Sequence, residues 1–501
     1  MTTLRSVSRY ALFVLLAFAL LPGANLISAN SSHARIVRLS LVQGDVRILR
    51  DSHGDPLANE KALWENAQLN LPLRKGIVIA TDDGRAGIEF ENGAMAYLND
   101  HSMLELYDLS LEDGSLVTRL ILRQGTASFY SHSVGADYFS VTGGDFTAEA
   151  TGNSSFRVNN YDDGSTVNVL AGRLSILHQD ETTPLSKGQS LSMRAGDAIS
   201  VNIGRVTDTD EFDHWVTGRA ETTVAATNAS MKYTSGSNYT AGFSDLYNYG
   251  GWYPLSGFGY GWRPFGAAFG WSPFDYGNWM MQPGFGYSFI GNQPWGWLPY
   301  HYGGWIFQPA IGWMWVPVGF GSGVQVVRFH PATATFVRSG NNVGIVPTHP
   351  LDAGGKTPVN LAHGVLPLSA GTSSPTATST KWKVVKTPPR DAMSSAKTLT
   401  SAAAPARVMR TISPAATTPA STRATTVPSG ARSAATRNPA AVSSSRNATT
   451  RTMTPPAARS SSRSRAESSS GARDSTAQRS APTRTSPAPA APRAAPSGRP
   501  H

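Results

Sequence analysis

The sequence predicts a mainly β protein in which one helix joins two β-rich regions and a long disordered tail follows. Three observations lead to this prediction. Short runs of alternating apolar residues, separated by turn residues, fill residues 35–205. Glycine and aromatic residues recur with a period of 26–27 residues within the region 246–350. From residue 351 onward the chain is mostly Ala, Ser, Thr, Pro and singly spaced Arg.

Residues 1–34 have the pattern of a signal peptide. Arg5 and Arg9 precede the apolar run 11–21, and small residues follow, with cleavage expected after Ala29 or Ala34. A transmembrane anchor is the alternative, but eleven apolar residues fall short of the roughly 20 that a bilayer helix needs. We therefore expect an exported protein, in the periplasm or at the cell surface, without a membrane span in the mature chain.

Residues 35–205 are predicted to form one β domain. Asn92-Gly93 is the strongest hairpin indication, because both residues tolerate the positive φ of a two-residue type I′ turn. Asp113-Gly114 and Asp163-Gly164 mark two more turns. Many short strands predict a sandwich, a barrel or a β-solenoid. The expected strands are Arg38–Val42, Val46–Leu49, Ile77–Ala80, Ala86–Phe90, Ala94–Leu98, Val117–Leu122, Val167–Leu170 and Leu174–Leu177.

Residues 206–245 contain the one convincing helix, from Thr207 to about Ala226. Asp208 is the expected N-cap, with Glu211 three residues further on. We interpret the helix as a packing strut between the β domain and the aromatic repeats, and a partner-docking helix is the alternative. Its predicted buried face carries Phe212, Trp215, Val216 and Ala220.

The region 246–350 is predicted to be an aromatic repeat domain. The segment Gly270–Trp279 aligns with Gly296–Trp305 at an offset of 26, and an earlier copy, Tyr249–Trp262, lies 27 residues upstream. Such a period indicates one small unit, a two-strand hairpin of about 26 residues, stacked or fanned three times.

Residues 246–316 contain 24 aromatic side chains but only seven Leu, Ile or Val. Two interpretations stay open. The rings form the core, since 24 of them at roughly 200 Å² each nearly fill what such a unit buries. Alternatively, some stay exposed and stack on the apolar faces of sugars, as a glycan- or cell-wall-binding module. The candidate ligand residues are Trp271, Trp279, Trp297, Tyr302, Trp305 and Trp313.

The tail gives the chain its basic charge. Residues 351–501 contain 21 Lys/Arg and 4 Asp/Glu, a net charge of +17, whereas residues 35–350 have a net charge of −9. We expect disorder because the tail has almost no large apolar side chains to bury. Export argues against a specific nucleic-acid partner. An envelope protein or an anionic envelope polymer is the expected partner.

Two stretches resemble known families. The β region resembles the FecR-like periplasmic domain through Gln43–Val46, Leu73–Ile77, Thr81–Ala86, Ile88–Gly93, Ser102–Leu106, Leu122–Gly125, Phe156–Val158, Val169–Leu174 and Leu185–Gln189. The repeats, with the helix before them, resemble an uncharacterised Trp/Tyr/Gly-rich module that accompanies such domains in exported bacterial proteins. Pro294–Trp305 is its most specific segment.

The resemblance implies a β-solenoid-like, non-enzymatic domain that binds proteins or senses ligands. In the founding regulators the domain relays signals from outer-membrane transporters to a cytoplasmic anti-sigma segment. Nothing resembling that cytoplasmic segment precedes Ala11 here. We therefore do not expect this protein to signal across the membrane as the founding regulators do.

No catalytic constellation is found in the sequence. There is no cysteine, and the histidines have no metal-ligand spacing, so we expect neither a metal nor a cofactor. His301, between two tyrosines, is interpreted as a polar member of an aromatic turn. Asp82–Gly84 and Asp162–Gly164 lack calcium-loop spacing and are interpreted as turns. We therefore expect an exported sensor or scaffold rather than an enzyme.

Overall fold

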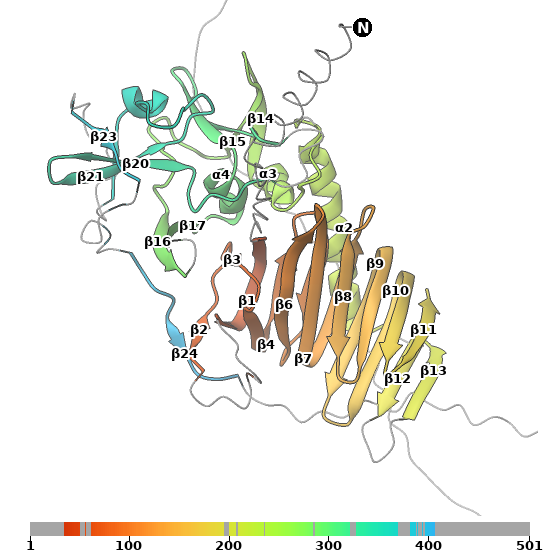
Figure 1. Ribbon diagram of the computed structural model, residues 1–501. Coiled ribbons are helices and arrows are strands. Elements are labelled where there is room, and N and C mark those ends of the chain that lie inside the picture. The colour runs from red at the N-terminus through yellow and green to blue at the C-terminus, as the bar shows by residue number, and fades with distance from the viewer. Residues whose placement is uncertain are drawn as a thin grey trace, which may run out of the picture. The chain divides into compact units, whose positions relative to one another are not determined.

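The computed structural model describes residues 35–405, apart from 51–55, 57–61, 195–199, 207–208, 235, 284–285, 321–326, 369–380, 387, 389–392 and 394–395. The predicted signal peptide and most of the predicted tail lie outside these residues. The chain is mainly β, as predicted (Figure 1). None of the described helices is both long enough and apolar enough to cross a bilayer.

The β domain contains thirteen strands joined in one sheet, most of them antiparallel, with β7 and β8 parallel. The eight predicted strands correspond to five of these thirteen, and the other eight were not predicted. Several strands are far longer than expected, the longest with 18 residues. The strands are β1 (Val37–Leu49), β2 (Trp64–Asn66), β3 (Pro72–Leu73), β4 (Val78–Glu89), β5 (Met95–Leu98), β6 (Met103–Glu112), β7 (Ser115–His132), β8 (Tyr138–Gly143), β9 (Phe146–Tyr161), β10 (Gly164–His178), β11 (Glu181–Ser186), β12 (Gln189–Arg194) and β13 (Ser200–Arg205).

The long strands change partners along their length. The first half of β7 pairs with β6 and β8, and its second half pairs with β5 and β9. β4 likewise pairs with β6 before the bend and with β5 after it. The sheet therefore folds on itself into two layers that share their strands, which is a sandwich assembled from bent strands.

A glycine lies at each bend. The β7 side chains in the apolar core are Leu120 and Leu122 before Gly125, then Ala127 and Phe129 after it, so the core-facing positions change from even to odd. A bulge that inserts one residue produces this change. Gly125 has φ +89°, and a Cβ there would lie 2.5 Å from the His101 carbonyl oxygen. The same role falls to Gly44 in β1 and Gly172 in β10.

Two turn predictions are wrong. Residues 82–84 are not a turn but part of β4, where Gly84 pairs with Gly44 at the bend. Asn92-Gly93 is not a type I′ turn, because that turn requires a positive φ at both residues. Here Gly93 has φ +88°, whereas the φ of Asn92 is not positive. The loop has three residues and closes through the Phe90 and Ala94 main chain. The two-residue turn with positive φ at both positions is Asp113-Gly114.

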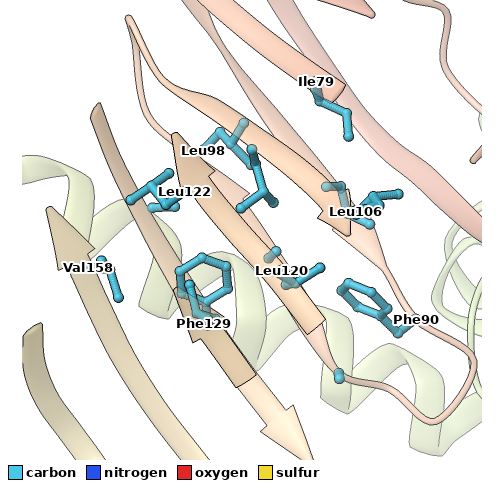
Figure 2. Packing of buried hydrophobic residues seen from close by; sticks show 14 of the residues in the cluster. Ile79, Phe90, Leu98, Leu106, Leu120, Leu122, Phe129 and Val158 are labelled. Carbon is cyan, nitrogen blue, oxygen red and sulfur yellow. The ribbon is translucent and has the colours of Figure 1, made fainter. Parts of the chain in front are cut away.

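The two layers enclose an aliphatic core. Its side chains come from every strand from β1 to β10 except the short strand β2, with Leu185, Leu191 and Met193 added from β11 and β12. Figure 2 shows Leu98, Leu120 and Phe129 among the side chains that meet in this interior. Leu71 and Leu73 complete the core at the end near β1.

Helix α2 (Glu211–Met231) has the predicted buried face, but its cap differs. The cap is Asp210 with Asp213, and both halves of the capping box are formed, whereas Asp208 lies outside the described residues. Phe212, Val216 and Ala220 pack on Met95 and Tyr97 of β5, and Trp215 lies partly buried beside them. Beyond the helix end, Tyr233 stacks on Trp252 at 5.2 Å between ring centres. The helix is therefore a strut between the two regions, as predicted.

The aromatic domain contains three hairpins, as the period predicts. They are β14 (Gly250–Leu255) with β15 (Gly259–Pro264), β16 (Gly277–Gln282) with β17 (Gly286–Gly291), and β18 (Gly304–Gln308) with β19 (Gly312–Val316). Each hairpin pairs two aromatic residues across its strands: Trp252 with Trp262, Trp279 with Phe289, and Trp305 with Trp315. The first and third hairpins join in a four-stranded sheet through Trp262 and Trp315, and the second stays apart.

Short helices and a last sheet complete the described chain. α3 (Phe243–Tyr249) precedes the first hairpin, and η1 (Pro294–Gly296) with α4 (Trp297–His301) precedes the third. A four-stranded sheet contains β20 (Ala334–Ser339), β21 (Asn342–Pro347), β22 (Leu366–Pro367) and β23 (Lys383–Val384), with η2 (Val359–His363) before β22.

The predicted start of the disordered tail at residue 351 is wrong. Beyond it, β22 and β23 complete the last sheet, and β24 (Ser401–Ala402) pairs with β2 of the β domain. The composition predicted disorder because few large apolar residues are present. The ordered pieces are held by main-chain pairing and by the few large apolar side chains present, since Leu366, Leu368 and Met393 are buried in the aromatic cluster.

Candidate functional site: a cleft between the two domains

A cleft of about 750 Å³ lies between the β domain and the aromatic domain. This volume lies in the range of small-molecule pockets. The β domain contributes the β6–β7 turn and the loop Val134–Asp137. The linker Ser237–Thr240 and the segment Val327–Pro331 contribute the other side. The site is therefore assembled from segments of both domains that are far apart in the sequence.

The inner wall of the cleft is aromatic. The rings of Tyr239 and Tyr302 lie 4.8 Å apart between centres, and Phe329 packs edge-on against Tyr302. The Tyr239 hydroxyl accepts a hydrogen bond from Trp297 Nε1 at 2.8 Å. Burial raises the pKa of both tyrosines far above the ordinary value, so both phenols stay protonated. The wall is therefore uncharged, and of its three rings only Phe329 is partly exposed.

Arg35 forms the charged part of the wall, and its charge is already paired. Its guanidinium donates to Glu91 Oε2 at 2.7 Å, to the Val117 carbonyl oxygen at 2.6 Å and to Thr118 Oγ1 at 3.0 Å. The Arg35 side chain is 1% exposed. Arg35 therefore fixes the chain at the base of the cleft and is not free to bind an anion.

The rim of the cleft is polar. His132, Asp113 and Arg328 line it with side chains that are exposed or half-buried. Asp137 shapes the adjoining loop, because its carboxylate accepts the N–H of Leu116 at 2.8 Å and the N–H of Val134 at 3.3 Å. An apolar floor below a rim of both charge signs suits an amphipathic ligand or a peptide segment.

A second buried network joins the two domains. Arg38 of β1 donates to Glu89 Oε2 at 3.1 Å, to Asn70 Oδ1 at 3.0 Å and to the Pro294 carbonyl oxygen at 3.2 Å. It also pairs with Asp245 of α3. Arg38 comes from the β domain, whereas Asp245 and Pro294 come from the aromatic domain. This network fixes the geometry of the interface that forms the cleft.

Burial shifts the ionisation of this network. Desolvation raises the pKa of Glu89 to about 7, although Arg38 pulls it down. Desolvation also raises the pKa of Asp245. Burial opposes the charge of Arg38, but Asp245 and Glu89 outweigh it and raise its pKa. Arg38 stays charged, and the two carboxyl groups compete for it.

The aromatic residues predicted as ligand contacts belong mostly to the core. Trp297, Trp305 and Tyr302 are at most 1% exposed, and Trp279 and Trp313 are also buried. These five rings present no free face for stacking on a sugar, because they fill the interior of a domain with few aliphatic residues. Trp271 is half-buried and packs on the same cluster, edge-on to Trp295. Tyr302 alone among the six lines the cleft.

Other rings of the aromatic domain are exposed instead. Phe269 is the most open at 76%, and Phe265 follows at 66%. Tyr253 and Tyr260 lie on the two strands of the first hairpin. The main-chain N–H of Phe265 donates to the Tyr249 carbonyl oxygen at 2.9 Å, which places these two residues side by side. The further exposed rings are Tyr247, Tyr249 and Tyr276.

His301 is part of the buried aromatic cluster. Its ring stacks on Phe329 at 4.8 Å, and Nδ1 lies 2.9 Å from the His330 carbonyl oxygen. Burial lowers its pKa to about 4, so the ring is neutral at pH 7. Within the described part of the chain, no group of three or more His, Asp or Glu side chains is placed to hold a metal ion.

Sequence reasoning did not find the cleft. Its lining residues come from hairpin loops and linkers, which carry no motif. One hint was available: the linker Ser237–Thr240 is polar yet lies between a predicted helix and the repeats, where both domains must meet.

Comparisons with known proteins confirm both sequence resemblances. Residues 77–175 match the FecR protein family model, and residues 243–352 match DUF6600, a family of unknown function. The first match covers most of the bent strands, and the second covers all three aromatic hairpins. No curated protein sequence matches the chain.

Two solved structures are similar to part of the chain. Both are crystal structures of a protein described as a candidate anti-sigma factor from Parabacteroides distasonis. One is 16% identical, with 28% of this chain and 64% of that chain covered and a TM-score of 0.25. The other is 15% identical, with 28% and 65% covered and a TM-score of 0.25. The chain thus spans less than two thirds of either relative, and this similarity indicates no function.

Proposed function

We propose that the protein is a non-enzymatic sensor or scaffold of the cell envelope, which binds a ligand or partner segment in the cleft. The cleft itself carries the proposal, because it needs both domains for its walls. The FecR match supports a sensory or regulatory role. The Arg38 network supports it too, because a ligand that shifts one domain against the other has to act through this network.

We place the protein outside the cytoplasm, in the periplasm or at the cell surface. The support is the charged and apolar pattern of residues 1–34. The expected partner is an envelope protein or an anionic polymer of the envelope. Cell fractionation of the full chain tests this placement, and recovery with the cytoplasmic fraction would contradict it.

The binding proposal is tested by narrowing the cleft. Val134 is 66% exposed on the cleft rim, so Val134→Trp fills space without disturbing the core. Val224, 49% exposed on α2 and away from the cleft, gives the matched control Val224→Trp. The probes are purified peptidoglycan and lipopolysaccharide, with retention of the protein as the measurement. We expect Val134→Trp to lose several-fold more retention than Val224→Trp.

Two outcomes count against the cleft. Equal retention of both variants would place binding elsewhere. A shortened chain that ends at Pro405 keeps every described residue. If this chain is no longer retained, the binding is due to the charge of the Arg-rich residues after Pro405 and not to the cleft.

A second candidate function is glycan binding by the exposed rings. The supporting observation is that seven Tyr and Phe side chains of the repeat region stay at least 40% exposed although most of its tryptophans are buried. Tyr253→Ala together with Tyr260→Ala would then lower retention on peptidoglycan. Tyr107→Ala is the control, because Tyr107 is a comparably exposed ring of the β domain. Unchanged retention of the double variant would reject this function.

A further inference from the structure

Beyond β10 the sheet of the β domain ends in two edge strands. The first part of β10 pairs with β12, which pairs with β13, whereas its second part pairs with β11 (Figure 1). Among the described residues, neither β11 nor β13 pairs with a further strand. An edge strand presents unpaired main-chain groups to other chains unless the sequence protects it. The protection of each edge therefore shows whether it is open to a partner.

The edge of β11 is closed to a further strand. The N–H of Lys187, directly after β11, donates to a β10 carbonyl oxygen at 3.2 Å. Because an antiparallel ladder alternates, the main chain points outward at Thr182, Pro184 and Ser186. Pro184 has no N–H, and the N–H of Ser186 already donates to Gln189 Oε1 at 2.7 Å. Two of the three donors are thus removed from this edge.

The edge of β13 has no such protection. The N–H of Val206, directly after β13, donates to the Gly188 carbonyl oxygen before β12 at 3.0 Å. The same alternation points the main chain outward at Val201, Ile203 and Arg205. β13 contains no proline, and Arg205 at its end is its only charged residue. Within the described part of the chain, the outward N–H groups of Val201 and Ile203 have no acceptor.

This open edge also carries apolar side chains. Val201 lies opposite Met193 of β12, and Ile203 lies opposite Leu191. Met193 and Leu191 are at most 2% exposed and belong to the apolar core. Side chains of directly paired residues lie on the same face of a sheet, so Val201 and Ile203 lie on the core side. They are nevertheless 44% and 52% exposed. The apolar face of this layer therefore continues to the edge strand and is open to solvent there.

We propose that β13 is a dimerisation edge, at which the β13 strands of two copies of this chain pair antiparallel about a two-fold axis at Asn202. Residues whose main chain points outward form the hydrogen-bonded pairs, which places Val201 opposite Ile203 of the partner subunit. Asn202 then lies opposite its own copy. Each strand supplies the donors and acceptors that the other lacks, and each extends the apolar face of the other.

The charge and the pattern of β13 favour a second copy as the occupant. Arg205 lies three residues from the axis in each strand, so the two arginines are about 20 Å apart along the sheet. Their repulsion is screened at this separation, because the Debye length is about 8 Å at physiological ionic strength. About five paired residues a side are far fewer than the roughly 20–30 of a standard interface. We therefore expect a weak dimer that forms as the protein concentration rises.

The chain has no cysteine, so one engineered cysteine reports the pairing. Asn202 forms a non-hydrogen-bonded pair at the axis, where Cα atoms lie about 4.5 Å apart, a spacing that permits a disulfide. Full-length Asn202→Cys is oxidised at increasing concentration and analysed by non-reducing electrophoresis. Thr182→Cys is the matched control, because Thr182 is also exposed but lies on the protected edge strand β11. We expect several-fold more disulfide-linked dimer from Asn202→Cys.

Two further variants test the edge itself. Ile203→Pro removes an outward N–H, as Pro184 does on β11, whereas Ile203→Lys keeps that N–H and places a charge on the apolar face. Either change, made in the Asn202→Cys chain, should lower the dimer fraction several-fold. Circular dichroism shows whether each variant folds, and Ile203→Lys decides the question if the proline variant does not fold.

Sedimentation equilibrium of the unsubstituted chain gives an independent measurement. We expect an average mass that rises with concentration from that of one chain towards that of two. A dimer fraction equal to that of Thr182→Cys, or one that neither change at Ile203 lowers, would reject the strand pairing. A chain that stays monomeric at every concentration would overturn the proposal and leave the edge to a strand of another protein. The result is independent of the cleft, which has no lining residue on β13.

Discussion

The β domain and the aromatic domain fill their interiors in different ways. The β-domain core consists largely of Leu, Ile, Val and Ala, which pack without directional bonds. In the aromatic core, four fully buried tryptophans also donate their indole N–H groups to acceptors inside the protein. The acceptors of Trp262, Trp297, Trp305 and Trp315 are Leu246 O, Tyr239 Oη, Thr333 Oγ1 and Tyr302 O.

This difference affects how each domain specifies its structure. An aliphatic core fixes which face of a strand points inward, and neighbouring shapes determine the rest. A tryptophan core adds hydrogen bonds of defined geometry, so each ring has a required orientation as well as a required volume. The aromatic domain can therefore be small and poor in aliphatic residues and still have a defined interior.

The largest expected effect comes from removing a ring of the aromatic core. Trp315 is fully buried, donates to the Tyr302 carbonyl oxygen at 2.7 Å and links the first and third hairpins. Trp315→Ala should lower the free energy of unfolding by about 3–5 kcal/mol. Trp315→Phe should lower the free energy of unfolding by less, although it still leaves the Tyr302 carbonyl oxygen without the indole donor. Urea unfolding measures both, with Leu122→Ala as the aliphatic reference. If Trp315→Phe behaved like the unsubstituted chain, packing alone would explain this core.

Next in size is a change at a bend of the β domain. Gly125→Ala places a Cβ 2.5 Å from the His101 carbonyl oxygen at φ +89°. Gly114→Ala is the matched control, because its φ of +83° is similar and a Cβ there meets nothing within 4 Å. The left-handed conformation alone costs about 1–2 kcal/mol. Gly125→Ala should lose distinctly more stability in thermal unfolding. Equal losses would show that the strands do not approach closely at the bend.

The interface between the domains should respond to pH. The pKa of Glu89 is about 7 in the folded chain and near 4.5 when exposed, so the folded state holds the proton more tightly. Stability should therefore fall as pH rises from about 4.5 to 7, by at most about 1.4 kcal/mol per pH unit for this group. Asp245 shifts in the same direction. Glu89→Gln should flatten the profile of unfolding free energy against pH. A profile as steep as before would assign the dependence to other groups.

The smallest predicted effect lies at the strut between the two domains. Asp210 caps α2 by accepting the N–H of Asp213, and it pairs with Arg157 at 2.7 Å. Asp210→Ala should cost about 1 kcal/mol through the lost cap. Glu211→Ala is the control, since Glu211 lies in the first turn but does not cap the helix. Circular dichroism during thermal unfolding measures both variants, and equal effects would contradict the cap.

Much of the local structure follows from the sequence. Apolar alternation located β1, β4, β5, β7 and β10 but not the other strands of the β domain. The 26–27-residue period located the three hairpins, because cross-strand partners must recur with the unit. The helix face from Phe212 to Ala220 followed from its spacing. The type of turn at Asn92-Gly93 could not be predicted from its two residues. A Gly in the left-handed region ends a three-residue loop as readily as a two-residue loop.

By itself, the sequence determined that the chain is mainly β, that its aromatic repeats lack aliphatic partners and that a charged tail follows. These features depend on side-chain type and spacing along the chain. The tertiary structure alone decided which rings stay outside the aromatic core, where the cleft opens and that β24 pairs with β2. These depend on which distant segments meet: the bends at Gly44 and Gly125, the Arg38 network and the pairing of Trp262 with Trp315 bring together residues that no local pattern connects.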